Sequence, residues 1–146
     1  MRENELFQIC SKVSSNKIVT AEEKGKKFQI YNSAGQKIIK VTVDGCVVND
    51  SSERCDYIFE IGKPVQHAFF VELKGNDIRK ACSQLYTTLT RFSNRYSGVQ
   101  TEACIVASNT KIPNTKLTQE KNRFKNDFGV KLTMKSRKYL VNLSLL

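Results

Sequence analysis

Several residue types are scarce or absent in this 146-residue chain, and each scarcity argues against a class of site. There is no tryptophan, and His67 is the single histidine. Because His67 has neither a second histidine nor a placed nucleophile, we interpret it as a polar residue at a strand start rather than part of a Ser-His-Asp or Cys-His site. The five cysteines contain no Cys-x-x-Cys pair, which argues against a zinc site or a disulfide framework.

The cysteines are therefore expected to be thiols. Cys10, Cys82 and Cys104 fall on apolar faces and are interpreted as small core residues. Cys46 and Cys55 can approach each other across strands, but in a reducing compartment both remain free thiols. The chain also lacks any run near the roughly 20 apolar residues of a membrane span, and residues 1–5 form no apolar leader. We expect a soluble, cytoplasmic protein with no membrane partner.

Positive charge is what the chain has in excess. It carries 24 Lys and Arg against 14 Asp and Glu, a net charge of +10. Nine of the cations lie between residues 111 and 139, where there are only two acidic residues. Such an excess favours an anionic partner, most often nucleic acid, although it can also simply keep a surface soluble.

Length and periodicity predict one α/β domain over residues 1–146, built on a mixed β-sheet flanked by α-helices. The segment 130–145 is predicted to form either one strand or two. The expected elements, in order, are a helix at 3–14, a hairpin of strands 27–31 and 37–43, strands 55–61 and 68–74, a helix at 77–95, a strand at 101–108, a helix at 117–128 and strand structure at 130–145.

The stretch from Cys55 to Leu89 carries the strongest pattern. Asp56 opens one strand, and the next strand runs through an apolar segment into Glu72, Leu73 and Lys74 before a helical period begins. Since side chains alternate along a strand, Glu72 and Lys74 share one face, and the opposite, apolar face is the expected core face. Strand pairing would bring the Asp56 carboxylate close to Glu72. Two carboxylates and a lysine suit a divalent metal and a phosphate.

An Asp at a strand start, Glu-x-Lys on the next strand and a following helix that carries Gln resemble the PD-(D/E)xK nuclease superfamily, which includes restriction endonucleases and archaeal Holliday-junction resolvases. The matching residues are Asp56, Glu72, Lys74 and Gln84, within residues 43–108. Cys55 stands where that family often has proline. The resemblance implies a restriction-endonuclease-like core. Many members carry a further acidic residue on an N-terminal helix, for which Glu3 and Glu5 are both candidates.

The resemblance also implies an activity, the metal-dependent hydrolysis of phosphodiester bonds in DNA by an endonuclease. Asp56, Glu72 and the backbone carbonyl of Leu73 would hold Mg²⁺, with Mn²⁺ as a substitute. Lys74 would position the attacking water, and Gln84 would contact the phosphate. The alternatives are a ribonuclease, a non-catalytic nucleic-acid-binding or protein-interaction module, and a chance charge pair, since Glu-x-Lys also occurs at 22–24.

Nucleic-acid contacts are expected on two helices. The cations predicted to make them are Lys80, Arg91, Lys121, Arg123 and Lys125. Cutting both strands of a duplex requires two sites, so a homodimer is a further expected partner. The apolar run 139–146 is either an ordinary core strand or a strand that pairs with its mate.

Overall fold

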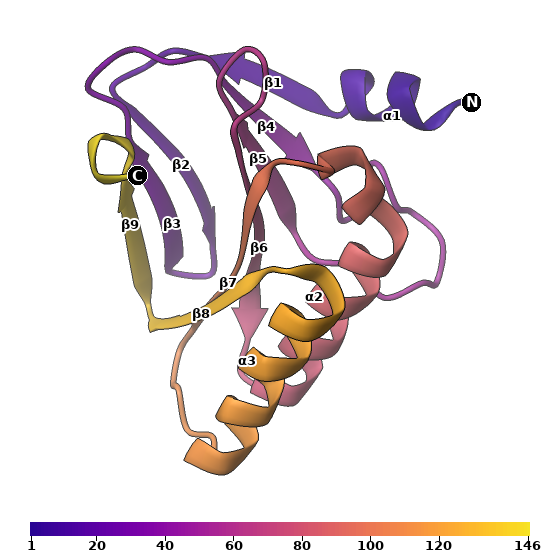
Figure 1. Ribbon diagram of the computed structural model, residues 1–146, viewed down its shortest axis with the longest axis vertical. Helices are drawn as coiled ribbons and strands as arrows, with labels where there is room; N and C mark the ends of the chain where they lie inside the picture. Colours follow the sequence, from indigo (N-terminus) through magenta and orange to yellow (C-terminus); the bar gives the residue numbers. More distant parts are fainter.

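The computed structural model covers residues 1–146 and describes the side chains of residues 1–73 and 76–146. Six consecutive strands follow the first helix, and helices and strands alternate only after them (Figure 1). In chain order they are α1 (Glu3–Ile9), β1 (Ser11–Ser14), β2 (Ile18–Glu23), β3 (Lys26–Tyr31), β4 (Ile38–Thr42), β5 (Tyr57–Ile61), β6 (His67–Gly75), α2 (Ile78–Phe92), η1 (Ser93–Tyr96), β7 (Gln100–Ala107), α3 (Asn114–Phe128), β8 (Lys131–Ser136), β9 (Lys138–Asn142) and η2 (Leu143–Leu145).

A six-stranded mixed sheet forms the centre, with the strand order β1-β4-β5-β6-β7-β8. Strands β1, β4, β5 and β6 pair in antiparallel fashion. Strands β6, β7 and β8 pair in parallel, joined by α2 and then α3. The α/β class and the mixed sheet flanked by helices are therefore confirmed.

The helices lie on one face of this sheet only, and a second sheet of order β2-β3-β9 covers the other face. The sheet is thus flanked by helices on one face and by strands on the other. The two crossovers β6–α2–β7 and β7–α3–β8 step in the same direction along the sheet, and crossovers share one hand, so both helices fall on the same side. The small sheet takes the place that helices would occupy on the other face.

Both faces of β6 are consequently core faces. Ala68 and Phe70 pack into the cluster beneath the helices, whereas Phe69, Val71 and Leu73 pack against the small sheet. The expected core face, which carries Val71 and Leu73, is confirmed as buried, and the face that carries Glu72 is buried as well. Near-continuous apolar runs such as 68–71 are typical of strands that are covered on both sides.

Local signals predicted the central elements well. The β5–β6 hairpin, the helix near 77–95 and the buried strand near 101–108 are confirmed as β5, β6, α2 and β7. Asp77 caps α2 by accepting a hydrogen bond from the Lys80 amide at 3.2 Å. Gly129 ends α3 with a left-handed φ of 66°, which glycine adopts without strain. Within the described residues, no helix is long and apolar enough to cross a membrane.

The N-terminal third differs from the expectation. The first helix ends at Ile9, and Val13 lies in β1 rather than on a helical face. Strands near 27–31 and 37–43 exist, but β3 and β4 belong to different sheets, so the predicted hairpin is wrong. Asn32 redirects the chain between them, because its side chain donates to the carbonyl of Gln36 at 2.8 Å and accepts from the Gln36 amide at 2.9 Å.

The cysteine prediction is also partly wrong. Cys10 and Cys46 form a disulfide that links the end of α1 to the turn after β4. Cys55, Cys82 and Cys104 are free and buried, as core residues should be. Local sequence gives no sign of the disulfide, since the two residues lie 36 positions apart and meet only through the pairing of β1 with β4.

The C-terminal run forms an ordinary strand of this chain. Strand β9 pairs in parallel with β3, and both Val141 and Leu143 are buried against the central sheet. Of the two alternatives for residues 139–146, the core strand describes the molecule.

Candidate active site

Asp56 lies just before β5, and Glu72 lies near the end of the neighbouring strand β6. The antiparallel register of the two strands ends at the pair of Tyr57 and Val71, the residues next to Asp56 and Glu72. Beyond that pair the Asp56 amide donates to the Val71 carbonyl at 3.1 Å, one residue out of the register. Because side chains alternate along a strand, Glu72 shares a face of β6 with Phe70, which packs beneath the helices.

Both acidic side chains are deeply buried. Asp56 is 3% exposed and Glu72 is 1% exposed. The Oδ2 atom of Asp56 accepts a hydrogen bond from the Leu73 amide at 2.8 Å, which ties the carboxylate to the end of β6. Burying carboxylates is costly without compensating partners. The Leu73 amide supplies one such partner for Asp56.

Helix α2 is bonded to the chain immediately before Asp56. The Cys55 amide donates to the Thr88 hydroxyl at 2.8 Å, and that hydroxyl donates to the Gln84 carbonyl at 2.7 Å. Gln84 and Thr88 are one turn apart and share a side of the helix. The half-buried Gln84 side chain thus lies on the side of α2 that meets the start of β5.

Sequence reasoning missed the roles of Cys55 and Thr88. The buried Cys55 thiol lies near both carboxylates: burial raises its pKa, and the negative charges of Glu72 and then Asp56 raise it further. The thiol is therefore protonated at neutral pH and is not a nucleophile. A threonine four residues after Gln84, within an apolar helical stripe, is the sequence signal for the contact between α2 and β5.

The donor set of this site fits Mg²⁺ better than a transition metal. Carboxylate oxygens are hard ligands, and Mg²⁺ is commonly bound through one or two carboxylates, with water and substrate phosphate completing its shell. No group of three or more His, Cys, Asp or Glu side chains that could hold a metal ion occurs among the described residues. The Lys74 side chain, a central part of the sequence prediction, lies outside the described residues, whereas the Leu73 side chain is buried on the other face.

Lys80 and Arg91, the predicted nucleic-acid-binding cations of α2, lie near opposite ends of this helix. Lys80 is exposed in the first turn of α2. Arg91 is exposed near the far end of α2, where its guanidinium lies 4.0 Å from Asp50 and stacks near the Phe92 ring. The helix rises about 1.5 Å per residue, so Lys80 and Arg91 lie about 16 Å apart along its axis.

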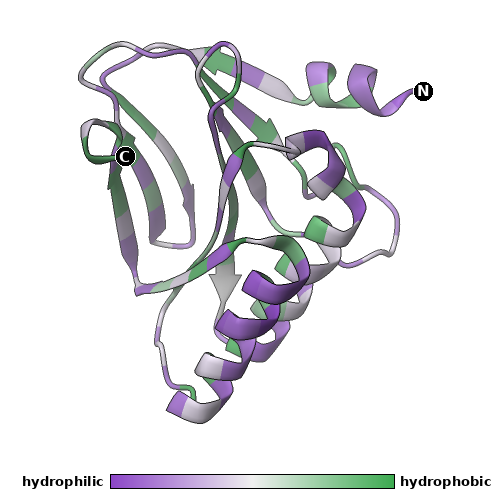
Figure 2. Ribbon diagram, viewed as in Figure 1, coloured by the Kyte–Doolittle hydropathy of each residue, from purple (hydrophilic) through white to green (hydrophobic). Residues whose placement is uncertain are grey.

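Helix α3 is largely hydrophilic (Figure 2), and the predicted cations on it differ in their surroundings. Lys121 and Lys125 are exposed and line a surface hollow together with Lys131. Arg123 is engaged elsewhere: it stacks 3.6 Å above the Tyr86 ring and lies 3.6 Å from Glu120. Lys121 and Lys125 are thus available to an anion, whereas Arg123 helps to hold α3 against α2.

The two candidates for an additional acidic residue lie on α1. Glu3 pairs with Arg95 at 3.2 Å, close to the end of α2. Glu5 is exposed. Glu3 is thereby committed to an ion pair beyond the C-terminal end of α2, away from Gln84.

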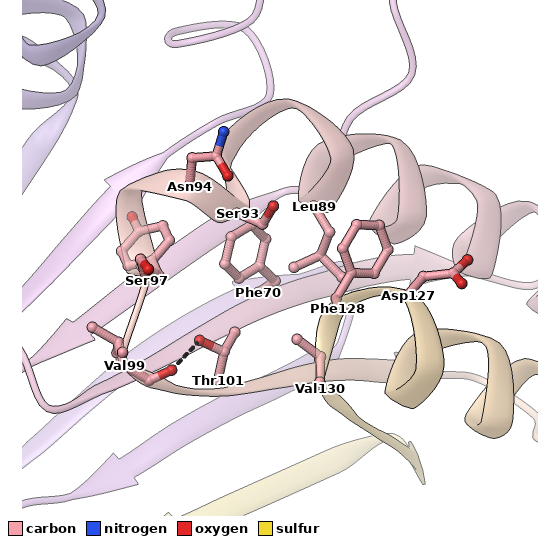
Figure 3. Close-up of a pocket in the computed structure, with 13 residues that line it drawn as sticks. Phe70, Leu89, Ser93, Asn94, Ser97, Val99, Thr101, Asp127, Phe128 and Val130 are labelled. Carbon is pink, nitrogen blue, oxygen red and sulfur yellow. Dashed lines mark hydrogen bonds between the residues drawn. The ribbon is translucent and has the colours of Figure 1, made fainter.

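A separate cavity of about 330 Å³ opens where the end of α2 meets the end of α3. Figure 3 shows Phe70, Leu89 and Phe128 at this cavity, with Asn94 and Asp127 near its margins. Of the described residues that line it, Asp127 alone is charged. Its carboxylate accepts a hydrogen bond from Tyr86 at 2.6 Å. This cavity lacks the cations that would attract a polyanion, so it does not extend the acidic site.

Comparisons of this chain with protein-family models, with curated proteins and with solved structures found no match. The assignment of a function therefore rests on the residues and their geometry.

Proposed function

We propose that this protein is a metal-dependent endonuclease that hydrolyses phosphodiester bonds in DNA, with a restriction-endonuclease-like core. The observation that carries the proposal is the burial of two carboxylates, Asp56 just before β5 and Glu72 on the adjacent strand β6. The meander β4-β5-β6, followed by α2 and the parallel strand β7, is compatible with such a core. The net charge of +10 supports a polyanionic substrate.

In this proposal Asp56 and Glu72 are the metal ligands, joined by the Leu73 carbonyl. When bound there, Mg²⁺ would lower the pKa of a water molecule and screen charge on the phosphate. The hydrogen bond from the Leu73 amide orients the Asp56 carboxylate in advance. Such orientation before substrate arrives reduces the rearrangement needed during the reaction.

Lys74 and Gln84 complete the proposed site. Lys74 follows Glu72 by two residues on β6 and would position the water or neutralise charge on the phosphate. Gln84 would contact the phosphate from α2. The bonds from Cys55 through Thr88 to Gln84 hold this part of the helix against the start of β5.

A second candidate is a non-catalytic nucleic-acid-binding module of the same fold. The observation that favours it is the burial of the acidic pair, since Asp56 and Glu72 are only 3% and 1% exposed. A site that cuts DNA must admit the scissile phosphate to its metal ligands.

Cleavage assays on purified protein separate these candidates. Supercoiled, linear, branched and single-stranded DNA, together with RNA, should be incubated with Mg²⁺, Mn²⁺ or EDTA. The endonuclease proposal expects DNA cleavage with Mg²⁺ or Mn²⁺, none with EDTA, and loss of cleavage in Glu72→Gln, which keeps the shape of the side chain. Binding without cleavage by the wild-type protein favours the non-catalytic module, and cleavage of RNA alone favours a ribonuclease.

Cleavage of both strands also calls for assembly. We propose a two-fold homodimer, because one metal site cuts one strand at each visit. Light scattering at micromolar concentration, with and without DNA, measures the mass directly. A strictly monomeric mass in both conditions would leave a nicking enzyme or a binding subunit.

A further inference from the structure

Two residues other than glycine have a positive φ among those the structure describes, and both are cationic. Lys24, in the turn between β2 and β3, has φ 50°, and Arg137, between β8 and β9, has φ 65°. L-residues with side chains rarely adopt this left-handed conformation, which glycine takes without steric penalty. Lys24 and Arg137 therefore carry a local conformational penalty that glycine would avoid. Residues held in such conformations cluster at functional sites.

Both residues lie at the same end of the molecule as the acidic pair. The Arg137 amide donates to the carbonyl of Ala107, the residue at the end of β7, at 2.8 Å. The Arg137 carbonyl accepts from the Lys27 amide at 2.9 Å, at the start of β3. Beside Lys24, the Glu23 carboxylate accepts a hydrogen bond at 3.1 Å from Tyr57, the residue after Asp56.

Lys26 is a third cation near these turns. It is 6% exposed and lies on the same face of β3 as Phe28, the face turned toward the central sheet. Within the described residues, the Lys26 ammonium group makes no hydrogen bond and no ion pair, and it is not among the side-chain atoms that are sealed from solvent. Glu23 is its register partner on β2, but its carboxylate bonds to Tyr57. The aliphatic stem of Lys26 is therefore buried while its charged end reaches solvent, as is common for lysine.

We propose that these residues form a phosphate-binding corner that holds the backbone of the nucleic acid next to the acidic site. The corner consists of Lys24, Lys26, Lys27, Arg137 and Lys138. An arriving phosphate would contact the Lys26 ammonium group at the surface, and Arg137 and Lys24 project from turns whose conformation favours glycine.

The position of the corner supports this assignment. In sheets with parallel strands, ligands bind beyond the carboxyl ends of the strands, and the corner lies where β7 and β8 end. Glu22 and Glu23 on β2 are the register partners of Lys27 and Lys26. The proposal rests on the proposed function for its ligand, since it places the corner beside the scissile phosphate. Contacts to backbone phosphates position a nucleic acid without reading its sequence.

The test measures stability and binding together. In Lys24→Gly with Arg137→Gly, relief of the backbone penalty offsets the added freedom of the unfolded chain, so the melting midpoint shifts by less than about 4 °C. Affinity for fluorescent DNA in EDTA falls roughly eightfold per lost contact at 0.1 M salt, and the salt slope falls by about 0.9 per contact on duplex or about 0.7 on single strands. Lys26→Met keeps the buried aliphatic stem, so it should leave the midpoint close to that of the wild type and weaken binding.

Lys63→Ala is the matched control, because it removes one exposed cation from the opposite end of β5 and β6 and should leave the salt slope unchanged. Corner variants that bind DNA as the wild type does would overturn the proposal, and so would polyglutamate competing as well as DNA. If Lys26→Met fails to fold and the double glycine variant binds DNA as the wild type does, then Lys26 has a structural role. That result would also overturn the proposal. Binding in EDTA is measured without cleavage. DNA binding that depends on the corner, in a protein that does not cleave DNA, would contradict the endonuclease proposal alone. DNA cleavage by a protein whose binding does not depend on the corner would contradict the corner proposal alone.

Discussion

The charged groups at the carboxyl end of β6 and β7 differ in kind from those on the outward face of α3. At the strand ends, Asp56 and Glu72 are buried and Arg137 holds a left-handed backbone. On α3, Lys121 and Lys125 stand in water on an ordinary helix. Solvated charges on a helix face carry little penalty and tolerate replacement, so their presence says little about function. Charges that the chain retains at an energetic cost are stronger evidence of a function than solvated charges are.

The largest expected difference compares two lysines. Lys74→Ala should lower the rate of DNA cleavage by at least roughly a hundredfold, because charge stabilisation at a reacting phosphate contributes several kcal/mol. Lys121→Ala should leave the rate nearly unchanged. Single-turnover cleavage at saturating protein measures both. Metal-dependent cleavage that survives in Lys74→Ala would point to another site or to a contaminating nuclease.

A smaller difference is expected in folding stability. Asp56→Ala removes the acceptor of the Leu73 amide, and an unsatisfied buried donor costs about 1–3 kcal/mol in the free energy of unfolding. Asp56→Asn keeps an oxygen acceptor and should lose less. Lys121→Ala should stay within about 0.5 kcal/mol of the wild type. Urea unfolding of the three variants gives the values. A more stable Asp56→Ala protein would mean that repulsion between the carboxylates outweighs the hydrogen bond.

The smallest effect per charge is expected on α3. Replacing Lys121, Arg123 and Lys125 together with Glu should weaken DNA binding and flatten its salt dependence, but less per charge than the corner variants do. Arg123 contributes little to binding because it is stacked on Tyr86. Fluorescence anisotropy across a salt series measures the slope. An unchanged affinity and slope would falsify any role of this face in binding.

The parts of the fold that sequence predicted correctly are those specified by local patterns. The apolar run 68–71, the helical stripe from Ile78 to Phe92 and the helix stop at Gly129 each need only neighbouring residues to be recognised. The pairing of Tyr57 with Val71, next to the two acidic residues, also follows locally, because a short hairpin sets its own register.

The parts that could not be predicted depend on distant contacts. Strand β3 pairs with β9, more than 100 residues later, so its separation from β4 leaves no trace in the local alternation. The burial of Lys26 follows from the same small sheet packing on the central one. At the candidate site, the contact from Thr88 to Cys55 depends on how α2 crosses the sheet, which periodicity does not specify.

The bond between Cys10 and Cys46 makes the surroundings of Asp56 sensitive to the redox state of the solution. The turn that carries Cys46 is also held by Asp56, whose carbonyl accepts from the Val43 amide at 3.0 Å. Closing a loop of this length restricts the unfolded chain by about 3–4 kcal/mol in the chain-entropy account. A reductant in the buffer would remove that restriction without touching either carboxylate. The oxidised and reduced forms of the same sequence thus differ in their free energy of unfolding, and each measured value applies to one of the two forms.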